Sequence, residues 1–155
     1  MKPLIVLLSV FVIFMVGTRL AHKRFMPTFS ARLAMAAMLF FTAIGHFIYV
    51  EGMSMMVPPA IPYKKEIIYT TGVLEILFAI LLSIRTNHKV VGWWLIIFFV
   101  CVLPGNIYAA IHHVDYQNAS YTGPGPKYLL FRIPLQLVFI AWVYFSTIRT
   151  GNKAV

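Results

Sequence analysis

The sequence predicts an all-α membrane protein with five transmembrane helices, in which the last four form a bundle. Three observations support this class. Of the 155 residues, 61% are hydrophobic and only 11% are charged, whereas soluble domains carry about 25% charged residues. The apolar residues gather in five continuous runs, each close to the roughly 20 residues that a helix needs to cross a bilayer. The runs lack the alternation of apolar and polar residues that a membrane β-barrel requires.

The five runs divide the chain into an anchor and a bundle. They cover Pro3–Gly17, Leu33–Val50, Ile67–Ile84, Val90–Ala110 and Tyr128–Thr147. The first run is short, but it reaches transmembrane length when Thr18 to Leu20 are included. It is followed by basic residues and lacks the small-residue cleavage pattern of a signal peptide. We therefore expect an uncleaved N-terminal transmembrane anchor over residues 1–20 and a four-helix bundle over residues 32–148.

The distribution of basic residues predicts the orientation in the membrane. Eight lie after the first run, after the third run and in the C-terminal tail: Arg19, Lys23, Arg24, Arg32, Arg85, Lys89, Arg149 and Lys153. Four lie on the opposite side: Lys2, Lys64, Lys65 and Lys127. Cytoplasmic loops carry the excess of Lys and Arg. We therefore expect a multi-pass protein of the bacterial inner (cytoplasmic) membrane, with its N-terminus outside and its C-terminus in the cytoplasm.

Two long connections are predicted to face outward. The first, Glu51–Glu66, contains three prolines and several Met and Val residues, which indicates a stiff apolar loop that lies on the bilayer or covers the bundle. A helix through Pro58, Pro59 and Pro62 is disfavoured, because proline removes a helical hydrogen bond and clashes with the preceding turn. The second connection, His112–Lys127, ends in a Gly/Pro turn.

Five strongly polar residues inside the predicted spans lie in the outer half of the last four helices. They are His46, Glu75, Asn106, Arg132 and Gln136. Glu75 is about nine residues from the outer end of its helix, hence ~13 Å deep. A lone ionised group at such a depth costs about 2.5–3.5 kcal/mol on insertion scales. We therefore expect these side chains to face the bundle interior, with Glu75 either protonated or paired with Arg132.

Two interpretations of this set of polar residues stay open. A buried Glu–Arg pair with amide neighbours can simply fix the register of the helices. An intramembrane ionisable residue is also, by default, a candidate functional residue. In the second interpretation the five residues bind a ligand in a pocket open to the outer leaflet, and no residue is assigned a catalytic role.

Several other classes of function have little support. The net charge of +9 comes from basic residues at the ends of apolar runs, so we expect no nucleic-acid partner. The single cysteine, Cys101, cannot form an intramolecular disulfide or a CxxC motif. Adjacent histidines such as His112 and His113 point about 100° apart on a helix, which disfavours a shared metal. A haem held between His46 and either of them has no motif behind it.

Four segments carry a family resemblance. They read AIGHFIYVEGMSMMVPPAIP, YTTGVLEILFAILLSIR, LPGNIYAAIHH and RIPLQLVFIAWVY. In this order they resemble the DoxX-like membrane proteins of the DoxX/MauE superfamily, over Arg32–Ile148. The resemblance implies a four-helix inner-membrane bundle, to which the first helix is an addition. It rests on Gly45-His46-Phe47, the Met/Pro loop, Thr71-Gly72 with Glu75, Pro104 with Asn106, and Arg132 with Gln136.

The functions that the resemblance implies are varied. The relatives that give the family its name are subunits of a thiosulfate:quinone oxidoreductase. Others take part in thiol or oxidative-stress functions, in methylamine-utilisation maturation or, in animals, in receptor assembly. The paired cysteines of the thiol-handling relatives are lacking here. The four-helix unit also resembles the sterol-isomerase-like membrane fold, in which acidic residues and a histidine act on a lipid-derived substrate, an analogy at the level of fold.

Three functions follow as expectations. The leading one is a redox-associated accessory subunit that binds a quinone or lipid-like molecule, with Glu75 and Arg132 as the polar base and hydrogen bonds from His46, Asn106 and Gln136. The first alternative is a non-enzymatic structural or assembly subunit, with partner subunits in a larger membrane complex. The second is a lipid-modifying enzyme in which Glu75 and His46 transfer protons.

Overall fold

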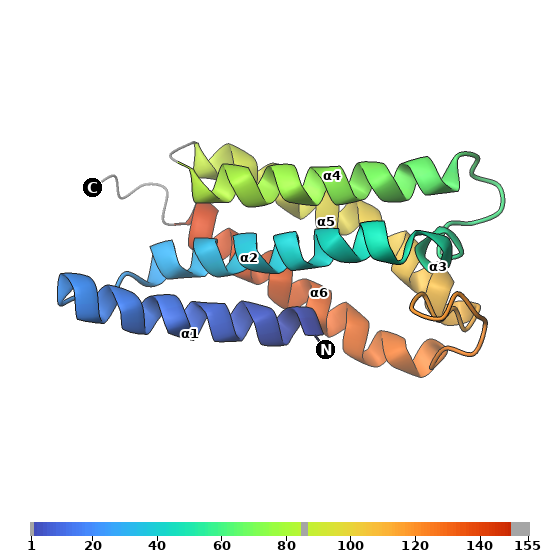
Figure 1. Ribbon diagram of the computed structural model, residues 1–155, viewed down its shortest axis with the longest axis horizontal. Coiled ribbons are helices and arrows are strands. Elements are labelled where there is room, and N and C mark those ends of the chain that lie inside the picture. Colours follow the sequence, from blue (N-terminus) through green and yellow to red (C-terminus); the bar gives the residue numbers. More distant parts are fainter. Residues whose placement is uncertain (1, 85–86, 150–155) are drawn as a thin grey trace.

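Long helices dominate the computed structural model, which describes residues 2–84 and 87–149 (Figure 1). The five long ones are α1 (Lys2–His22), α2 (Pro27–Ile48), α4 (Lys64–Ser83), α5 (His88–Ile111) and α6 (Leu129–Val143). A short helix α3 (Val50–Ser54), a 3₁₀ turn η1 (Pro126–Tyr128) and a π-helical turn η2 (Tyr144–Ile148) complete the described part. Five helical spans are long and apolar enough to cross a membrane, the last running from η1 through η2. The chain is therefore an all-helical, multi-pass membrane protein, as the composition predicts.

The predicted helices are confirmed, with shifted ends. The helix expected from Ile67 begins three residues earlier, after Tyr63, whose left-handed backbone (φ 56°) separates it from the preceding loop. Pro27 starts α2, as suits a residue whose missing N–H is not needed in the first turn. No helix crosses the three prolines between Pro58 and Pro62, as expected, but the unpredicted helix α3 forms the start of that connection. Met1, Arg85 and Lys153, used in the sequence predictions, lie outside the described residues.

The core lies between α2, α4, α5 and α6. The largest fully buried apolar side chains are Met35, Met38, Leu39, Leu82, Leu95 and Val143 of these helices, together with Leu7, which α1 contributes. A chain of aromatic contacts links three of the helices, from Phe78 through Phe98 and Phe99 to Phe139, with ring centroids 5.6–6.2 Å apart. Most other apolar side chains face outward, as expected where lipid replaces water.

Helix α1 packs on the bundle but is displaced along it. Leu7 is fully buried in the core, and the Phe11 ring meets the edge of Trp142 at a centroid distance of 5.1 Å. Figure 1 shows that α1 begins beside the middle of α2 and continues past the point where α2 begins. The α1 helix therefore covers only the part of the bundle near the α1–α2 turn.

The connections alternate between the two ends of the bundle. Helix α3, the loop before α4 and the segment between α5 and α6 gather at one end, and the α1–α2 and α4–α5 turns lie at the other (Figure 1). This up-and-down order agrees with the order predicted from the basic residues. The polar residues of the next section lie toward the end that carries α3.

Candidate functional site

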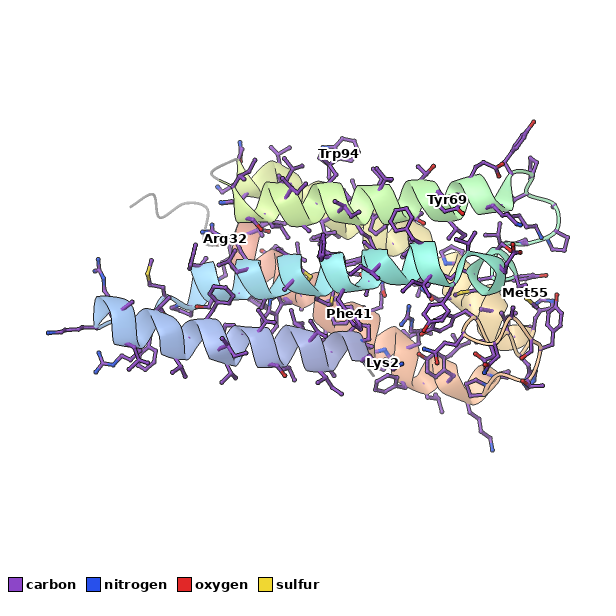
Figure 2. All side chains as sticks on the ribbon, in the orientation of Figure 1. Lys2, Arg32, Phe41, Met55, Tyr69 and Trp94 are labelled. Carbon is purple, nitrogen blue, oxygen red and sulfur yellow. The ribbon has the colours of Figure 1, made fainter. Side chains whose placement is uncertain are left out.

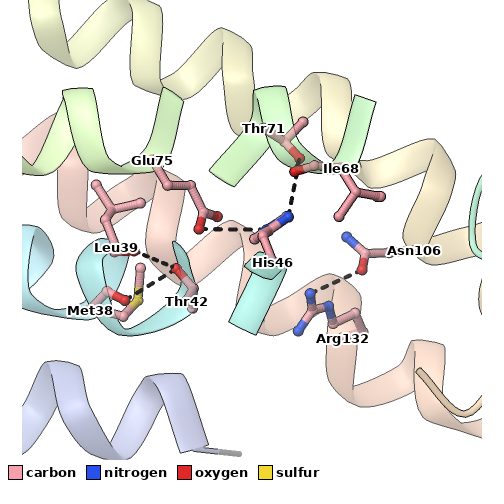
Figure 3. Close-up of polar contacts among 9 residues, drawn as sticks. All are labelled: Met38, Leu39, Thr42, His46, Ile68, Thr71, Glu75, Asn106 and Arg132. Atoms are coloured by element: carbon pink, nitrogen blue, oxygen red, sulfur yellow. Dashed lines mark hydrogen bonds and ion pairs between the residues drawn. The ribbon is translucent and has the colours of Figure 1, made fainter. Parts of the chain in front are cut away.

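Glu75 faces α2 and approaches His46, not Arg132. Its Oε2 lies 3.6 Å from Nε2 of His46 (Figure 3). The expected Glu75–Arg132 pair is therefore wrong. The reason is the neighbour of α4: Gly72, one turn before Glu75, lies so close to α2 that a Cβ there would be 2.8 Å from the Cβ of His46. The face of α4 that carries Gly72 and Glu75 thus packs on α2, whereas Arg132 belongs to α6.

Thr71 extends this pair into a chain of polar contacts. Its hydroxyl donates to the Ile68 carbonyl (2.9 Å) and lies 3.1 Å from Nδ1 of His46. A hydroxyl has one hydrogen, so His46 Nδ1 donates to Thr71 while Thr71 donates to Ile68. Nε2 then faces Glu75 Oε2, a buried atom without a hydrogen-bond partner among the described residues. The imidazole of His46 therefore lies between the Thr71 hydroxyl and the Glu75 carboxyl group.

Arg132 and Asn106 form a second, separate pair between α6 and α5. Nη2 of Arg132 donates to Oδ1 of Asn106 at 3.0 Å, and the Asn106 amide nitrogen donates to the Val102 carbonyl at 3.2 Å (Figure 3). Nε of Arg132 is buried and has no partner within the described ranges. Among those residues the guanidinium also has no carboxylate within 4.0 Å. The Asn106 side chain is thus oriented by the backbone of α5, and it accepts from one of the five N–H donors of the guanidinium.

Gln136 does not join either pair. It lies one turn after Arg132, but its amide nitrogen donates to the Phe99 carbonyl at 2.8 Å, and the side chain is buried. It does not line the cavity described next. The spacing from Arg132 correctly placed it inside the bundle, but its contact is with the backbone of α5. Its role in the structure is to join α6 to α5.

A cavity of about 560 Å³ lies beside the two polar pairs. His46, Glu75, Asn106 and Arg132 all line it. The apolar part of the lining is Phe41, Ile44, Ile48, Met53, Met56, Ala109, Ala110 and Val114. Ligand sites are typically about 300–1,000 Å³, mostly apolar, with a few convergent polar groups. Four of the five predicted residues therefore lie on one cavity of ligand-binding size and composition.

Several cavity residues were not predicted from the sequence. Lys2 lines it because α1 begins beside the middle of α2, an offset that no local sequence signal reveals. Tyr49 and Tyr116 meet edge to face, with centroids 5.9 Å apart, at the end that carries α3. Burial raises the pKa of the Tyr116 phenol above its usual value. The apolar Met/Pro segment was the one available signal, since Met53 and Met56 line the cavity.

The segment after α5 is held by its own hydrogen bonds. Asp115 pairs with Ser120 in an isolated β-bridge. Its carboxylate accepts hydrogen bonds from the Asn118 side chain (2.7 Å) and from the Gln117 backbone N–H (3.0 Å). These hydrogen bonds lower the pKa of Asp115, and the bond from Asn118 has the larger effect. Gly52 of α3 lies against the Tyr116 backbone with no room for a Cβ. The segment after α5, which lines the cavity at Val114–Gln117, is therefore well packed.

His112 and His113 make contacts within their own segment of the chain. Nδ1 of His112 is 3.0 Å from the Tyr108 carbonyl, and Nδ1 of His113 is 3.3 Å from the Gly123 carbonyl. Within residues 2–84 and 87–149, no three His, Cys, Asp or Glu side chains are grouped as metal ligands would be.

Comparisons with known proteins address the family. A family model described as a domain of unknown function, DUF8561, matches residues 35–147. The chain belongs to the DUF8561 family. No curated protein and no solved structure matches the chain. The resemblance to DoxX-like proteins stays a prediction.

The region that matches DUF8561 includes most of the bundle and excludes the N-terminal part of the chain. The DUF8561 match begins at Met35 in α2 and ends at Thr147 in η2. It contains all five predicted site residues and both covering segments of the cavity. Helix α1 lies outside the match, so Lys2 and Pro3 are the cavity residues that this DUF8561 protein supplies from elsewhere.

Proposed function

We propose that this DUF8561 protein binds a hydrophobic molecule with a polar end, a quinone or a lipid-like compound, in the cavity between α2, α5 and α6. The observation that carries the proposal is the convergence of His46, Glu75, Asn106 and Arg132 on one apolar cavity of about 560 Å³. Such a volume suits a ligand of that type. The polar residues would hold the polar end, and the apolar walls would hold the rest.

The proposed position in the membrane gives the ligand a source. The basic residues favour an inner-membrane protein with its N-terminus outside, and in this orientation the α3 end of the bundle would lie in the outer leaflet. The cavity includes Lys2 and Pro3 at the start of α1 and Phe41 of α2. Figure 2 shows Lys2 and Phe41 near each other, at the point where α1 ceases to cover α2. A lipid-like molecule could therefore enter from the side.

A role as an accessory subunit in a redox-associated membrane complex remains part of the proposal. Its support is the resemblance to DoxX-like proteins alone. The non-enzymatic alternative, a structural or assembly subunit, has the same support, together with the apolar loop before α4. Purification in mild detergent separates the two: an assembly subunit carries a stoichiometric partner protein and no small molecule.

Filling the cavity tests the main proposal. Gly45 lines it, and a Cβ there would meet only Met53 Cε, at 3.7 Å. A Gly45→Trp side chain therefore has room to start and would occupy the ligand space. The matched control is Gly17→Trp on α1, where no atom lies within 4 Å of the added Cβ. We expect native mass spectrometry to detect a co-purified amphiphile on the wild type and the control, but not on Gly45→Trp. Equal retention by all three would refute a ligand in this cavity.

A second candidate function is lipid modification by proton transfer, which the Thr71–His46–Glu75 chain favours. Its 3.6 Å end contact and 3.1 Å link to Thr71 give a buried group that can accept or give a proton beside a bound molecule. Glu75→Gln removes the carboxylate while keeping the shape. If the wild type converts a lipid substrate and Glu75→Gln does so at the same rate, this candidate is excluded.

A further inference from the structure

We propose that the molecule bound in the cavity has an anionic head group, a carboxylate or a phosphate, and that Arg132 binds that group. The inference rests on the proposed function, because it concerns the same cavity. It narrows the ligand from any amphiphile to an anionic one, and it disfavours a neutral quinone.

The donors of Arg132 are the first observation. A guanidinium has five N–H donors and stays protonated in proteins. Among the described residues the guanidinium makes one hydrogen bond, from Nη2 to the neutral Asn106 amide, and the buried Nε has no partner there. A carboxylate or phosphate accepts two parallel N–H bonds from such a fork. The geometry of Arg132 is therefore suited to an oxyanion.

The charge of Arg132 is the second observation. An arginine inside a membrane span is costly unless an anion or water compensates its charge. No carboxylate of the described residues lies within 4.0 Å of it. A negatively charged ligand would compensate the charge of the guanidinium, whereas a neutral polar ligand would not.

The other charged groups of the cavity do not compete for this role. Glu75 faces His46 on the α2–α4 side. Asp115 lies in the loop, where Gln117 and Asn118 already donate to its carboxylate. Lys2, exposed at the start of α1, is a second cation on the lining. Both acids are thus engaged elsewhere, while Arg132 remains without a carboxylate partner.

The apolar walls indicate where the hydrocarbon part would lie. Phe41, Ile44 and Ile48 follow an i, i+3, i+7 pattern, so they share one face of α2. All three line the cavity, yet they are 41%, 44% and 65% exposed. This face therefore continues from the cavity to the lipid-facing surface. An amphiphile with its head at Arg132 could leave its tail along it.

Defined membranes test the head group. The wild type and its variants are reconstituted in phosphatidylcholine nanodiscs containing a minor fraction of phosphatidylglycerol, of oleate or of a neutral quinone. Retained molecules are then counted by native mass spectrometry. We expect the wild type to retain an anionic compound over phosphatidylcholine and the quinone. Because Arg132→Gln removes a charge-assisted hydrogen bond, we expect it to bind the anionic compound about tenfold more weakly, or weaker still. Arg132→Lys should retain more than Arg132→Gln, and Arg19→Gln, outside the cavity, should match the wild type.

Each result has a distinct meaning. Retention of phosphatidylglycerol alone indicates a phosphate head group, and retention of oleate alone a carboxylate. Retention of the quinone or phosphatidylcholine in preference to both anions overturns the inference even if Arg132→Gln does not fold, because this comparison needs only the wild type. If Gly45→Trp abolishes binding while a folded Arg132→Gln binds normally, the cavity function stands and the anionic head group is wrong. If the wild type retains nothing, both proposals fail.

Discussion

Gly72 shows how one residue determines the partner of Glu75. The glycine lets α4 approach α2 until a Cβ would stand 2.8 Å from His46 Cβ and 3.2 Å from a Phe47 ring atom. His46 Cβ is attached directly to the α2 backbone, so it cannot move without the helix. The close approach brings the carboxylate of Glu75 to His46 and away from α6. Gly72 therefore decides that the partner of Glu75 lies on α2.

This contact predicts the effect of Gly72→Ala. Alanine is about 1 kcal/mol better than glycine in a helix interior, but overpacking costs about 1–3 kcal/mol. Because the nearest atom cannot yield, we expect net destabilisation and a lower thermal unfolding temperature in detergent. Gly17→Ala is the control: with no atom within 4 Å of its Cβ, it should be neutral or stabilising. A more stable Gly72→Ala would contradict the tight α2–α4 contact.

The two amide residues are predicted to differ in function. Asn106 lines the cavity and holds Arg132, whereas Gln136 is buried against the Phe99 carbonyl. Asn106→Leu should therefore weaken ligand retention, measured by native mass spectrometry. Gln136→Leu should lower the free energy of unfolding by about 0.5–1.5 kcal/mol through the lost hydrogen bond. It should leave ligand retention unchanged. Reversed effects would show that the cavity has been assigned to the wrong residues.

At the scale of elements, α1 is part of the packed structure although the family match excludes it. Leu7 is fully buried, while Leu20 on the same helix is 78% exposed. The beginning of α1 also brings Lys2 and Pro3 to the cavity. The N-terminal helix was predicted as an anchor, and its packing adds a wall to the site.

This packing predicts unequal effects of two alanine substitutions on α1. Leu7→Ala leaves a space in the core, for which the cost in proteins is about 2–5 kcal/mol. We expect the lower end, because the unfolded helix would still lie in lipid and the transfer term is small. Leu20→Ala should change stability by less than about 0.5 kcal/mol. Thermal unfolding of both variants checks this, and equal effects would mean that α1 does not pack on the core.

At the scale of the whole molecule, the sequence predicted the helices better than their contacts. Runs of about 20 apolar residues reveal membrane spans. The distribution of the basic residues correctly predicted which connections share an end of the bundle. Which helices are neighbours depends on close approaches such as Gly72 against His46, which no single run contains. Hence Glu75 was assigned the wrong partner, although Glu75 and three of the four other predicted site residues line one cavity. The offset of α1, and with it Lys2, has no signature in the sequence.

The proposed orientation can be tested on the complete chain. Cys101, the single cysteine, is replaced by serine, and a new cysteine is placed at Asn118 or at Lys23. With the N-terminus outside, a membrane-impermeant maleimide should label Asn118→Cys in intact cells and Lys23→Cys only after the membrane is opened. The converse labelling pattern would invert the topology and move the cavity to the inner leaflet.

The displacement of α1 has a consequence for the surrounding bilayer. A helix of 21 residues is ~31 Å long, enough to span a normal hydrocarbon layer. If the other helices match the bilayer, the start of α1 is too deep for its lysine, because an ammonium in hydrocarbon is costly. Thinning of the bilayer relieves such a mismatch at a modest cost. We therefore expect the leaflet at the α3 end of the bundle to dip beside Lys2, so that the head groups of neighbouring lipids lie level with the opening of the cavity.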